Sequence, residues 1–255
     1  MSAHDNPADH WAHTIVGLPL GAPPLRTLSL ERQERIDTHN IALDQQQFKI
    51  RLANSDGRRE SASLLIKKMY TWRGYETAGA SSDTPNRITL IADLEGHVIS
   101  TLTIGLDSAA GLLVDTLYQD EIDRLRQDQR RVSEFTKLAV DQAVKSKRVL
   151  ASLFHLAYIY AHLIHGATDT VIEVNPRHTL FYKRMLGFEQ LGQERMCPRV
   201  NAPAVLLHLP FAFATKEIAR HGGAFVEIPG VKSIYPYFFS RQDESGMVAR
   251  LMRPS

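Results

Sequence analysis

One carboxylate in the sequence has neighbours that suit a general base. Glu134 lies in the run VSEFTKLAV (132–140), whose composition predicts a strand with polar inserts. Burial among apolar neighbours disfavours the charged carboxylate and raises its pKa, as a base that works near neutral pH requires. A simple ion pair with Lys137 or Arg131 is the alternative role for Glu134.

A second group of polar residues lies at the end of an apolar strand and along the helix after it. The segment VIEVNPRHTLFYKRMLGFEQLG (171–192) predicts a strand, an N-cap at Asn175 with proline at the first helical position, and a helix that Gly187 ends. Tyr182 follows Asn175 by seven residues, so two helical turns place both on a similar side. A cap and a core tyrosine are the alternative roles for the pair.

The elements that position these residues alternate along the chain. Between about 45 and 210 the periodicities predict the order β-α-β-β-α-β-α-β-α-β-β, an α/β domain with a mixed sheet and helices on both faces. A long apolar helix at 146–166 is long enough for a crossover connection, so its flanking strands are expected to be parallel and central. We expect an N-terminal extension at 1–40, the core at 41–210, and a C-terminal extension at 211–255 that packs on the core.

Composition excludes several classes of protein. The chain has 255 residues, of which 44% are hydrophobic and 23% charged, which is typical of an ordinary globular protein. A single cysteine, Cys197, cannot form an intrachain disulfide or a cysteine-based zinc site, so we expect a structural role for it. A net charge of +2 gives no reason to expect nucleic-acid binding. We expect no signal peptide and no transmembrane segment, and therefore a cytoplasmic location.

The order strand, Asn175, helix, Tyr182, Gly187-Phe188, strand resembles the last motif of the GNAT-type N-acyltransferases. The resemblance implies a GNAT-like fold. It also implies that Asn175 contacts the pantetheine arm of a thioester donor and that Tyr182 protonates the leaving thiolate. Four residues separate Tyr182 from Gly187, where the common pattern has three.

The junction after the Glu134 strand differs from the glycine-rich turn with which this fold grips the diphosphate of acetyl-CoA. It reads Lys145-Ser146-Lys147-Arg148, three cations and a possible N-cap serine that together suit one phosphate, which is what the pantetheine of an acyl carrier protein presents. Because carrier proteins are acidic, the excess of cations between 124 and 148 favours docking of one there, with a solvated charged surface as the alternative. The eight cations are Arg124, Arg126, Arg130, Arg131, Lys137, Lys145, Lys147 and Arg148.

The stretch from 48 to about 209 further resembles the N-acyl amino acid synthases, relatives of the acyl-homoserine-lactone synthases. The segments that carry the resemblance are MYTWRGYE, STLTIGLDSAAGLLVDTLYQDEID and RRVSEFTKLAV. The lactone synthases carry Glu-x-Ser-Arg where residues 134–137 read Glu-Phe-Thr-Lys. The missing arginine argues against a homoserine-lactone or S-adenosylmethionine acceptor. The resemblance implies amide formation from acyl carrier protein and an amino acid.

Amide formation from a thioester requires a neutral amine, a polarised carbonyl and a proton for the leaving thiolate. An α-amino group with a pKa of about 8 is roughly one-tenth neutral at pH 7, so Glu134 acting through water suffices as base. We expect backbone N–H groups near Leu138 and Ala139, in a bulge, to stabilise the oxyanion. Glu173 either lines the cleft beside Glu134 or pairs with one of the basic residues 177–178.

The candidates for substrate binding are chosen by side-chain type, because a carboxylate needs a cation and an acyl chain needs apolar neighbours. Arg51 on the first strand and Arg73 after the first helix could bind the acceptor's carboxylate through paired hydrogen bonds, or could be surface residues. An acyl chain requires an apolar slot. The candidates for that slot are Leu150, Phe154 and Tyr158, with the aromatic residues Tyr235, Tyr237, Phe238 and Phe239.

His155, His162 and His165 share one face of the long helix, but without a carboxylate at ligand spacing we expect core and surface histidines rather than a metal site. We expect no permanently bound cofactor. The sequence thus predicts an N-acyltransferase that moves a long-chain fatty acyl group from acyl carrier protein, or alternatively from acyl-CoA, to an amino acid. The alternatives are an acetyl-CoA-dependent acetyltransferase of a small molecule or protein, and a non-catalytic module that binds acyl groups or a partner.

Overall fold

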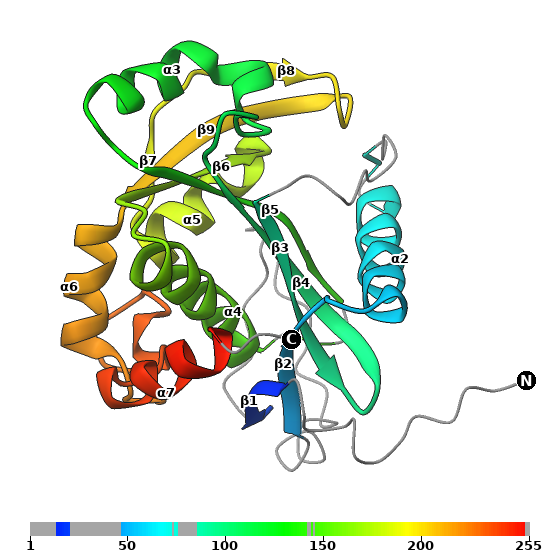
Figure 1. Ribbon diagram of the computed structural model, residues 1–255, viewed down its shortest axis with the longest axis vertical. Coiled ribbons are helices and arrows are strands. Elements are labelled where there is room, and N and C mark those ends of the chain that lie inside the picture. Colours follow the sequence, from blue (N-terminus) through cyan, green and yellow to red (C-terminus); the bar gives the residue numbers. More distant parts are fainter. Residues whose placement is uncertain are drawn as a thin grey trace, which may run out of the picture.

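The chain builds an open mixed sheet that carries helices on both faces (Figure 1). The computed structural model describes residues 14–20, 47–72, 74–75, 86–141, 144 and 146–252. Within these residues the nine strands follow the order β1-β2-β3-β4-β5-β6-β9-β7, and β8 pairs with β9. The strands are β1 (Thr14–Pro19), β2 (Gln47–Leu52), β3 (Arg87–Leu94), β4 (His97–Leu106), β5 (Val132–Val140), β6 (Asp169–Val174), β7 (Glu189–Gln190), β8 (Arg195–Cys197) and β9 (Ala202–Pro210). The predicted mixed α/β class is confirmed.

The helices divide between the two faces of the sheet. They are α2 (Asp56–Trp72), α3 (Asp115–Gln127), α4 (Lys147–Tyr158) with its π-helical continuation η3 (Ile159–Ile164), the 3-10 turn η4 (Pro176–His178), α5 (Thr179–Leu186), α6 (Phe211–His221), the 3-10 turn η5 (Tyr235–Tyr237) and α7 (Arg241–Leu251). Side chains of α2 pack on Ala139, and those of α3 pack on Val132. These two residues of β5 share a face because a bulge shifts the alternation between them. Helix α4 packs on the opposite face against Phe135. No helix in the described ranges combines the length and the apolar character that crossing a membrane requires.

The elements from β2 to β9 follow the predicted order, except that three strands, not two, come after α5. Helix α4 and η3 together connect β5 to β6, and these strands are parallel and central, as a crossover connection requires. Strand β1 was not predicted, although it pairs antiparallel with β2 at the edge of the sheet. Its sequence contains Gly17 and Pro19, which are typical of turns and are tolerated in a strand only at an edge.

The hairpin turn between β3 and β4 forms where the sequence predicts it. Glu95 and Gly96 have φ angles of 52° and 85°. Two consecutive positive φ angles are characteristic of a type I′ turn, whose twist matches that of the flanking strands. The Asp93 carboxylate accepts a hydrogen bond from the Gly96 N–H at 3.2 Å.

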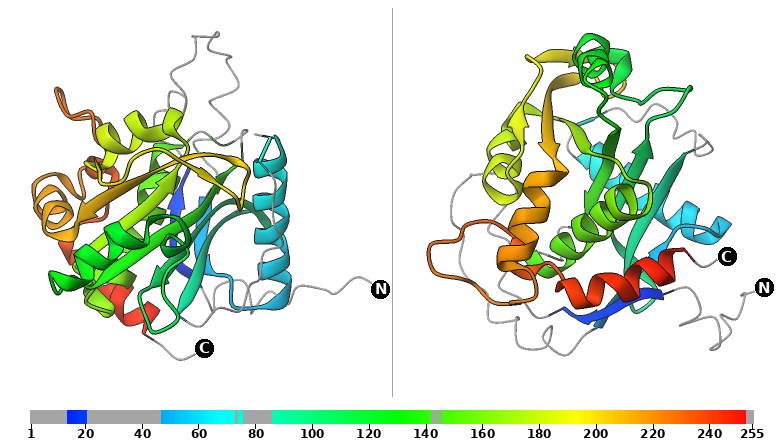
Figure 2. Two further views of the ribbon diagram at one scale, coloured as in Figure 1. Left: turned by 90° about the horizontal axis from the view of Figure 1, so that it is seen from above. Right: turned by 60° about the vertical axis from the view of Figure 1, so that its left-hand side comes forward.

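The segment after β9 is fastened to α4 by a buried histidine. His155 Nδ1 accepts a hydrogen bond from the Phe239 N–H at 2.9 Å, and Nε2 lies 3.0 Å from a carboxylate oxygen of Glu244 on α7. The imidazole stacks on Phe238 and Phe239. Burial lowers the pKa of His155 despite Glu244, so the ring is neutral and donates its Nε2 proton to that carboxylate. Helix α7 also lies beside β1, which brings segments from both ends of the described chain together (Figure 2).

We expect the variant His155→Ala to lose about 3 kcal/mol of unfolding free energy at about pH 8, because it opens a cavity and leaves the Phe239 N–H without its acceptor. The pKa of His155 is lower in the folded chain, so below about pH 6.5 the unfolded chain takes up this proton first. The wild type therefore loses stability as the pH falls, so the difference in unfolding free energy between the wild type and the variant should be smaller at about pH 5.5 than at about pH 8. Urea denaturation at both pH values measures this difference, with His97→Ala, at an exposed position, as control. An equal deficit at both pH values contradicts this assignment.

Candidate active site

Strands β5 and β6 are paired only where they begin. Residues 132–134 pair with residues 169–171, and the described structure has no further pair, although β5 continues to Val140 and β6 to Val174. The strands therefore part beyond Glu134, toward the ends at which α4 and η4 begin (Figure 1). Strands that separate in this way turn backbone polar groups toward the gap, where an extended ligand can bind them.

A β-bulge in β5 lies at this gap. The pairing with β4 slips by one residue between Thr136 and Ala139, so Lys137 and Leu138 stand opposite a single residue of β4. Lys137 has a φ angle of 51°, and the Thr101 hydroxyl donates to its carbonyl at 2.8 Å. The bulge that we expected near Leu138 and Ala139 is thus present. That its N–H groups stabilise an oxyanion stays a prediction.

Glu134 lies just before the strands part and is almost completely buried. Its Oε1 accepts a hydrogen bond from the Leu113 N–H at 3.0 Å, and its Oε2 accepts one from the Val114 N–H at 3.1 Å. Arg87 of β3 forms an ion pair with Oε1 at 2.8 Å. Burial raises the pKa of the carboxyl and outweighs the opposing effects of the N–H groups and of Arg87. The predicted direction of the pKa shift is confirmed.

The ionic partner of Glu134 comes from β3 and not from the neighbouring sequence. The described ion pairs join it to neither Lys137 nor Arg131, which was the alternative that we had expected. Arg87 faces Glu134 across β4, because both are register partners of Gly105. A Cβ atom at Gly105 would come within 2.8 Å of the Glu134 side chain, so only glycine leaves room for this pair. Sequence reasoning missed Arg87, since its relation to Glu134 depends on strand register.

Glu173 shares a face of the sheet with Glu134, but it is held by a residue outside the candidate set. Its Oε2 forms an ion pair with Arg199 at 2.5 Å. The expected alternative partners, Arg177 and His178, lie beyond the end of β6, and the described ion pair of Glu173 is with Arg199 instead. Arg199 also donates to the Leu113 carbonyl at 3.1 Å, so the loop before α3 binds the Glu134 carboxylate directly and is linked to Glu173 through Arg199. Arg199 lies in the turn between β8 and β9, and no sequence signal singled it out.

Asn175 and Tyr182 take up the structural positions that the sequence predicts. The Asn175 side chain accepts from the Arg177 N–H at 3.2 Å and donates to the Pro203 carbonyl at 3.2 Å, which fixes it at the end of β6. Tyr182 is buried on α5, and its ring meets that of Phe154 edge-on at a centroid distance of 6.4 Å. Their contacts with a donor stay predictions.

Ser146 begins α4 as its N-cap. The hydroxyl accepts a hydrogen bond from the Val149 N–H at 3.4 Å and donates to the Leu20 carbonyl at 3.1 Å. The predicted cap is confirmed, but both functions of the hydroxyl are already used. Two other candidates, Lys145 and Arg73, lie outside the described residues.

The two cations after Ser146 turn toward other parts of the chain. Lys147 forms an ion pair with Glu227 of the C-terminal segment. Arg148 donates to the Pro19 carbonyl at 3.3 Å and lies over the ring of Phe225. A phosphate at the start of α4 therefore competes with existing partners for both side chains.

The seven described cations between 124 and 148 do not gather on one surface, and docking of a carrier protein stays a prediction. Four of them precede β5, whereas Lys147 and Arg148 follow it, and the nine residues of that strand separate its ends by about 26 Å. Arg126 is further bound by three carboxylates, those of Asp107, Asp115 and Asp123, at 2.7 Å each. Lys137 lies at the gap between β5 and β6, and Lys147 and Arg148 follow the end of β5 beyond it.

Arg51 lies on β2, far from the gap. It is buried and pairs in register with Ile91 of β3. Strands β3 and β4 separate β2 from β5, a distance of about 14 Å across the sheet. Arg51 is therefore placed on a different part of the sheet from Glu134.

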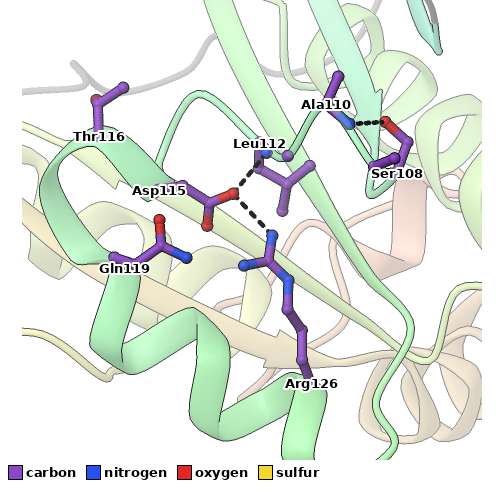
Figure 3. A pocket seen from close by; sticks show the side chains of 9 residues that line it. Ser108, Ala110, Leu112, Asp115, Thr116, Gln119 and Arg126 are labelled. Carbon is purple, nitrogen blue, oxygen red and sulfur yellow. Dashed lines mark hydrogen bonds and ion pairs between the residues drawn. The ribbon is translucent and has the colours of Figure 1, made fainter.

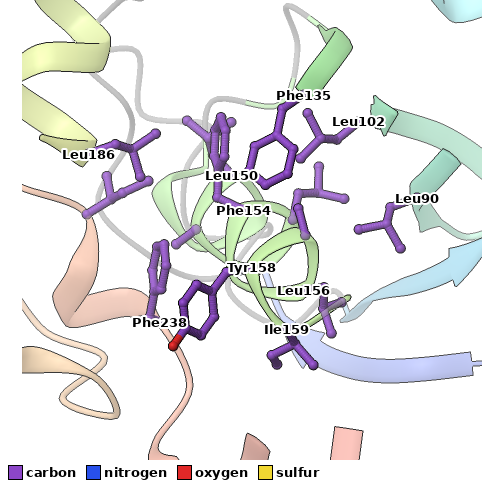
Figure 4. Packing of buried hydrophobic residues seen from close by; sticks show 14 of the residues in the cluster. Leu90, Leu102, Phe135, Leu150, Phe154, Leu156, Tyr158, Ile159, Leu186 and Phe238 are labelled. Carbon is purple, nitrogen blue, oxygen red and sulfur yellow. The ribbon is translucent and has the colours of Figure 1, made fainter. Parts of the chain in front are cut away.

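The three residues expected to line an acyl slot fill the main core instead (Figure 4). Leu150, Phe154 and Tyr158 are only 1, 3 and 4% exposed. The Phe154 ring contacts Phe135, and the Tyr158 hydroxyl is hydrogen-bonded to Thr215 at 2.8 Å. An acyl chain reaches this region only if side chains move. The aromatic residues Tyr235, Tyr237, Phe238 and Phe239 are buried in the same core.

An open pocket of about 440 Å³ lies beside the loop that holds Glu134 (Figure 3). It is formed by residues 108–112 and by the polar side of α3. Asp115 accepts from the Leu112 N–H at 2.7 Å and pairs with Arg126. Arg126, one of the eight cations between 124 and 148, lines this pocket, whereas none of the residues expected to act in catalysis or to bind the donor, the acceptor or the acyl chain does.

The histidines of the long helix have separate surroundings. His155 binds Glu244, whereas His162 Nδ1 lies 2.6 Å from the Ala167 carbonyl. Across the ranges that the structure describes, no three His, Cys, Asp or Glu side chains are grouped so that they could hold a metal ion. Cys197 is buried, and burial raises the pKa of its thiol.

Comparisons with known proteins relate this geometry to a family. The sequence model of the family described as "N-acyl amino acid synthase FeeM" matches residues 61–210, more than half of the chain. The solved structure of FeeM, an N-acyl amino acid synthase from uncultured soil microbes, is similar with a TM-score of 0.61 and 28% identity, over 66% of this chain and 92% of that one. A putative N-acetyltransferase from Lactobacillus plantarum (TM-score 0.47, 19% identity, 64% and 97% covered) and an acyl-CoA N-acyltransferase from Pseudomonas aeruginosa (0.45, 11%, 64% and 98%) are also similar. No curated protein sequence matches significantly.

Proposed function

Because the chain belongs to the FeeM family of N-acyl amino acid synthases, we propose that it transfers a long-chain fatty acyl group from acyl carrier protein to the amine of an amino acid. The observation that carries this proposal is the gap between β5 and β6. The gap opens directly beyond the buried Glu134 and contains the bulge at Lys137 and Leu138. Such a gap suits a thin, extended thioester arm.

In this proposal the donor binds along the gap. The pantetheine arm lies between β5 and β6, with Asn175 at its side, and its phosphate lies near the start of α4, where Lys145 and Ser146 precede the helix. Helix N-termini favour anions through their free N–H groups. In this proposal the thioester carbonyl is polarised by the N–H groups of Leu138 and Ala139, because a bulge leaves backbone groups out of the regular ladder.

The acceptor amine attacks the thioester carbon from the face that α2 and α3 cover. A C–N bond forms, the C–S bond breaks, and the amine loses one proton. Glu134 takes that proton through water, since burial raises the pKa of its carboxyl. Tyr182 gives a proton to the leaving thiolate. Glu173 lies on the same face of the sheet as Glu134 and assists it there, held in place by its ion pair with Arg199.

The identity of the donor is argued from the junction between β5 and α4. Residues 141–146 contain no glycine, whereas the turn that presents several N–H groups to a diphosphate is glycine-rich. This favours a carrier protein, which presents one phosphate, over acetyl-CoA. An acetyltransferase and a silent binding module are the competing functions.

We expect the purified protein to use a long-chain acyl carrier protein at least about 10-fold better, in kcat/KM, than the CoA thioester of the same chain length, because protein docking adds charge complementarity at the edge after β5. Mass spectrometry of products formed from a mixture of amino acids measures this. Preference for acetyl-CoA would establish the acetyltransferase. Absence of any product with every donor would favour the binding module.

A further inference from the structure

One cation beside Glu134 has no partner in the described structure. Lys137 follows Glu134 by three residues on β5, Arg87 meets Glu134 across β4, and the charges of both groups act on the Lys137 ammonium. Glu134 already binds Arg87 and two backbone N–H groups, and Glu173 is paired with Arg199. No described ion pair includes Lys137, so its half-buried positive charge at the bulge favours an anion there.

The preceding residue carries an unused hydroxyl. Thr136 Oγ1 is buried and has no hydrogen-bond partner among the described residues. The nearby threonines are satisfied, since Thr89 and Thr103 share a hydrogen bond of 2.8 Å and Thr101 donates to the Lys137 carbonyl. A buried hydroxyl without a partner costs about 1–3 kcal/mol. A ligand that supplies an acceptor removes this cost.

We propose that Lys137 and Thr136 bind the carboxylate of the acceptor amino acid, an inference that rests on the function proposed above. In an α-amino acid the carboxylate lies about 3 Å from the amine, so its ligand must stand close to the attacking nitrogen. Lys137 belongs to the bulge that is proposed to hold the thioester carbonyl. Glu134, the proposed base, precedes it by three residues.

This assignment differs from the sequence-based choice of Arg51. Arg51 lies on β2, about 14 Å across the sheet from β5, so its guanidinium does not serve a carboxylate whose amine is at the bulge. Lys137 replaces it as the residue that selects amino acids over simple amines. A lysine binds a carboxylate as a point charge, without the paired geometry of arginine.

The variants Lys137→Met, Lys137→Arg and Lys67→Met test this, each assayed with amino acids and with their uncharged α-amides. Lys137→Met should lower kcat/KM for the acids about 100-fold, as expected for loss of a half-buried charge pair, and leave the amides nearly unchanged. Lys137→Arg should keep most of the preference for acids. Lys67 is exposed on α2, and its replacement controls for the lost charge. An equal loss for acids and amides in Lys137→Met overturns the proposal.

A binding measurement distinguishes failure of this site from failure of the proposed function. Lys137 in the full chain is acetylated with N-hydroxysuccinimide acetate, and the modified peptide is measured by mass spectrometry. A mixture of N-acetyl amino acids should protect Lys137, whereas the matching amides should not, and Lys67 should react equally in both. Protection without any acyl transfer would support the carboxylate site and reject the enzyme function. Acyl transfer without protection would support the enzyme and reject the site.

Discussion

Replacing Glu134 with glutamine should lower kcat/KM for acyl transfer by about 100-fold or more, the usual contribution of a positioned general base. The amide keeps the shape of the side chain but cannot accept the amine's proton. Steady-state rates with the preferred acyl donor and amino acid measure the loss. Unchanged turnover would leave Glu134 with a structural role alone.

Two contributions to this loss must be separated, because Glu134 also holds the loop before α3. Its oxygens accept from Leu113 and Val114 and pair with Arg87, so the glutamine NH₂ group displaces one donor at a cost of about 1–3 kcal/mol in stability. Urea denaturation of Glu134→Gln shows whether the chain remains folded. A folded variant with lost activity supports the role as base.

Arg87→Met serves as the matched control, since it removes the ion pair and keeps the carboxylate. Arg87 opposes the rise in the pKa of Glu134 that burial causes. Its loss should raise that pKa further, so the acid limb of the kcat/KM profile moves to higher pH. In Glu134→Gln the same limb should disappear. An unmoved limb in Arg87→Met would mean that another group titrates.

Local signals in the sequence predicted most of the elements from β2 onward and several of their ends. Ser146 and Asn175 cap their segments, and Gly187 ends α5 with a φ angle of 81°, because capping depends on residues a few positions apart. The length of the segment between β5 and β6 was enough to predict that these strands are parallel.

Relations between distant residues could not be predicted in this way. Arg87 meets Glu134, and Arg199 meets Glu173, only because the register of the strands brings them together. Counting charges along the chain did not predict a surface either, since β5 separates the described cations before residue 132 from Lys147 and Arg148 after its other end. The sequence showed which residues could act as bases or ion-pair partners, whereas the partner of each residue in space depended on the fold.

The second large effect is expected from Tyr182→Phe, which should lower kcat about 100-fold and change KM little. The ring keeps its edge-on contacts with Phe154 and Phe188, so the variant loses the hydroxyl but not the packing. Tyr160→Phe removes a tyrosine hydroxyl from the half-buried η3 and serves as the control.

The leaving group distinguishes acid catalysis by Tyr182 from a role in packing. A thiol of low pKa departs as a thiolate and gains little from a proton donor. With an acyl ester of an aromatic thiol as donor, the difference in kcat between Tyr182→Phe and the wild type should therefore narrow to a few-fold. A difference that stays near 100-fold with both donors would show that the Tyr182 hydroxyl orders the core near the gap, and that the proton for the thiolate comes from another group or from water.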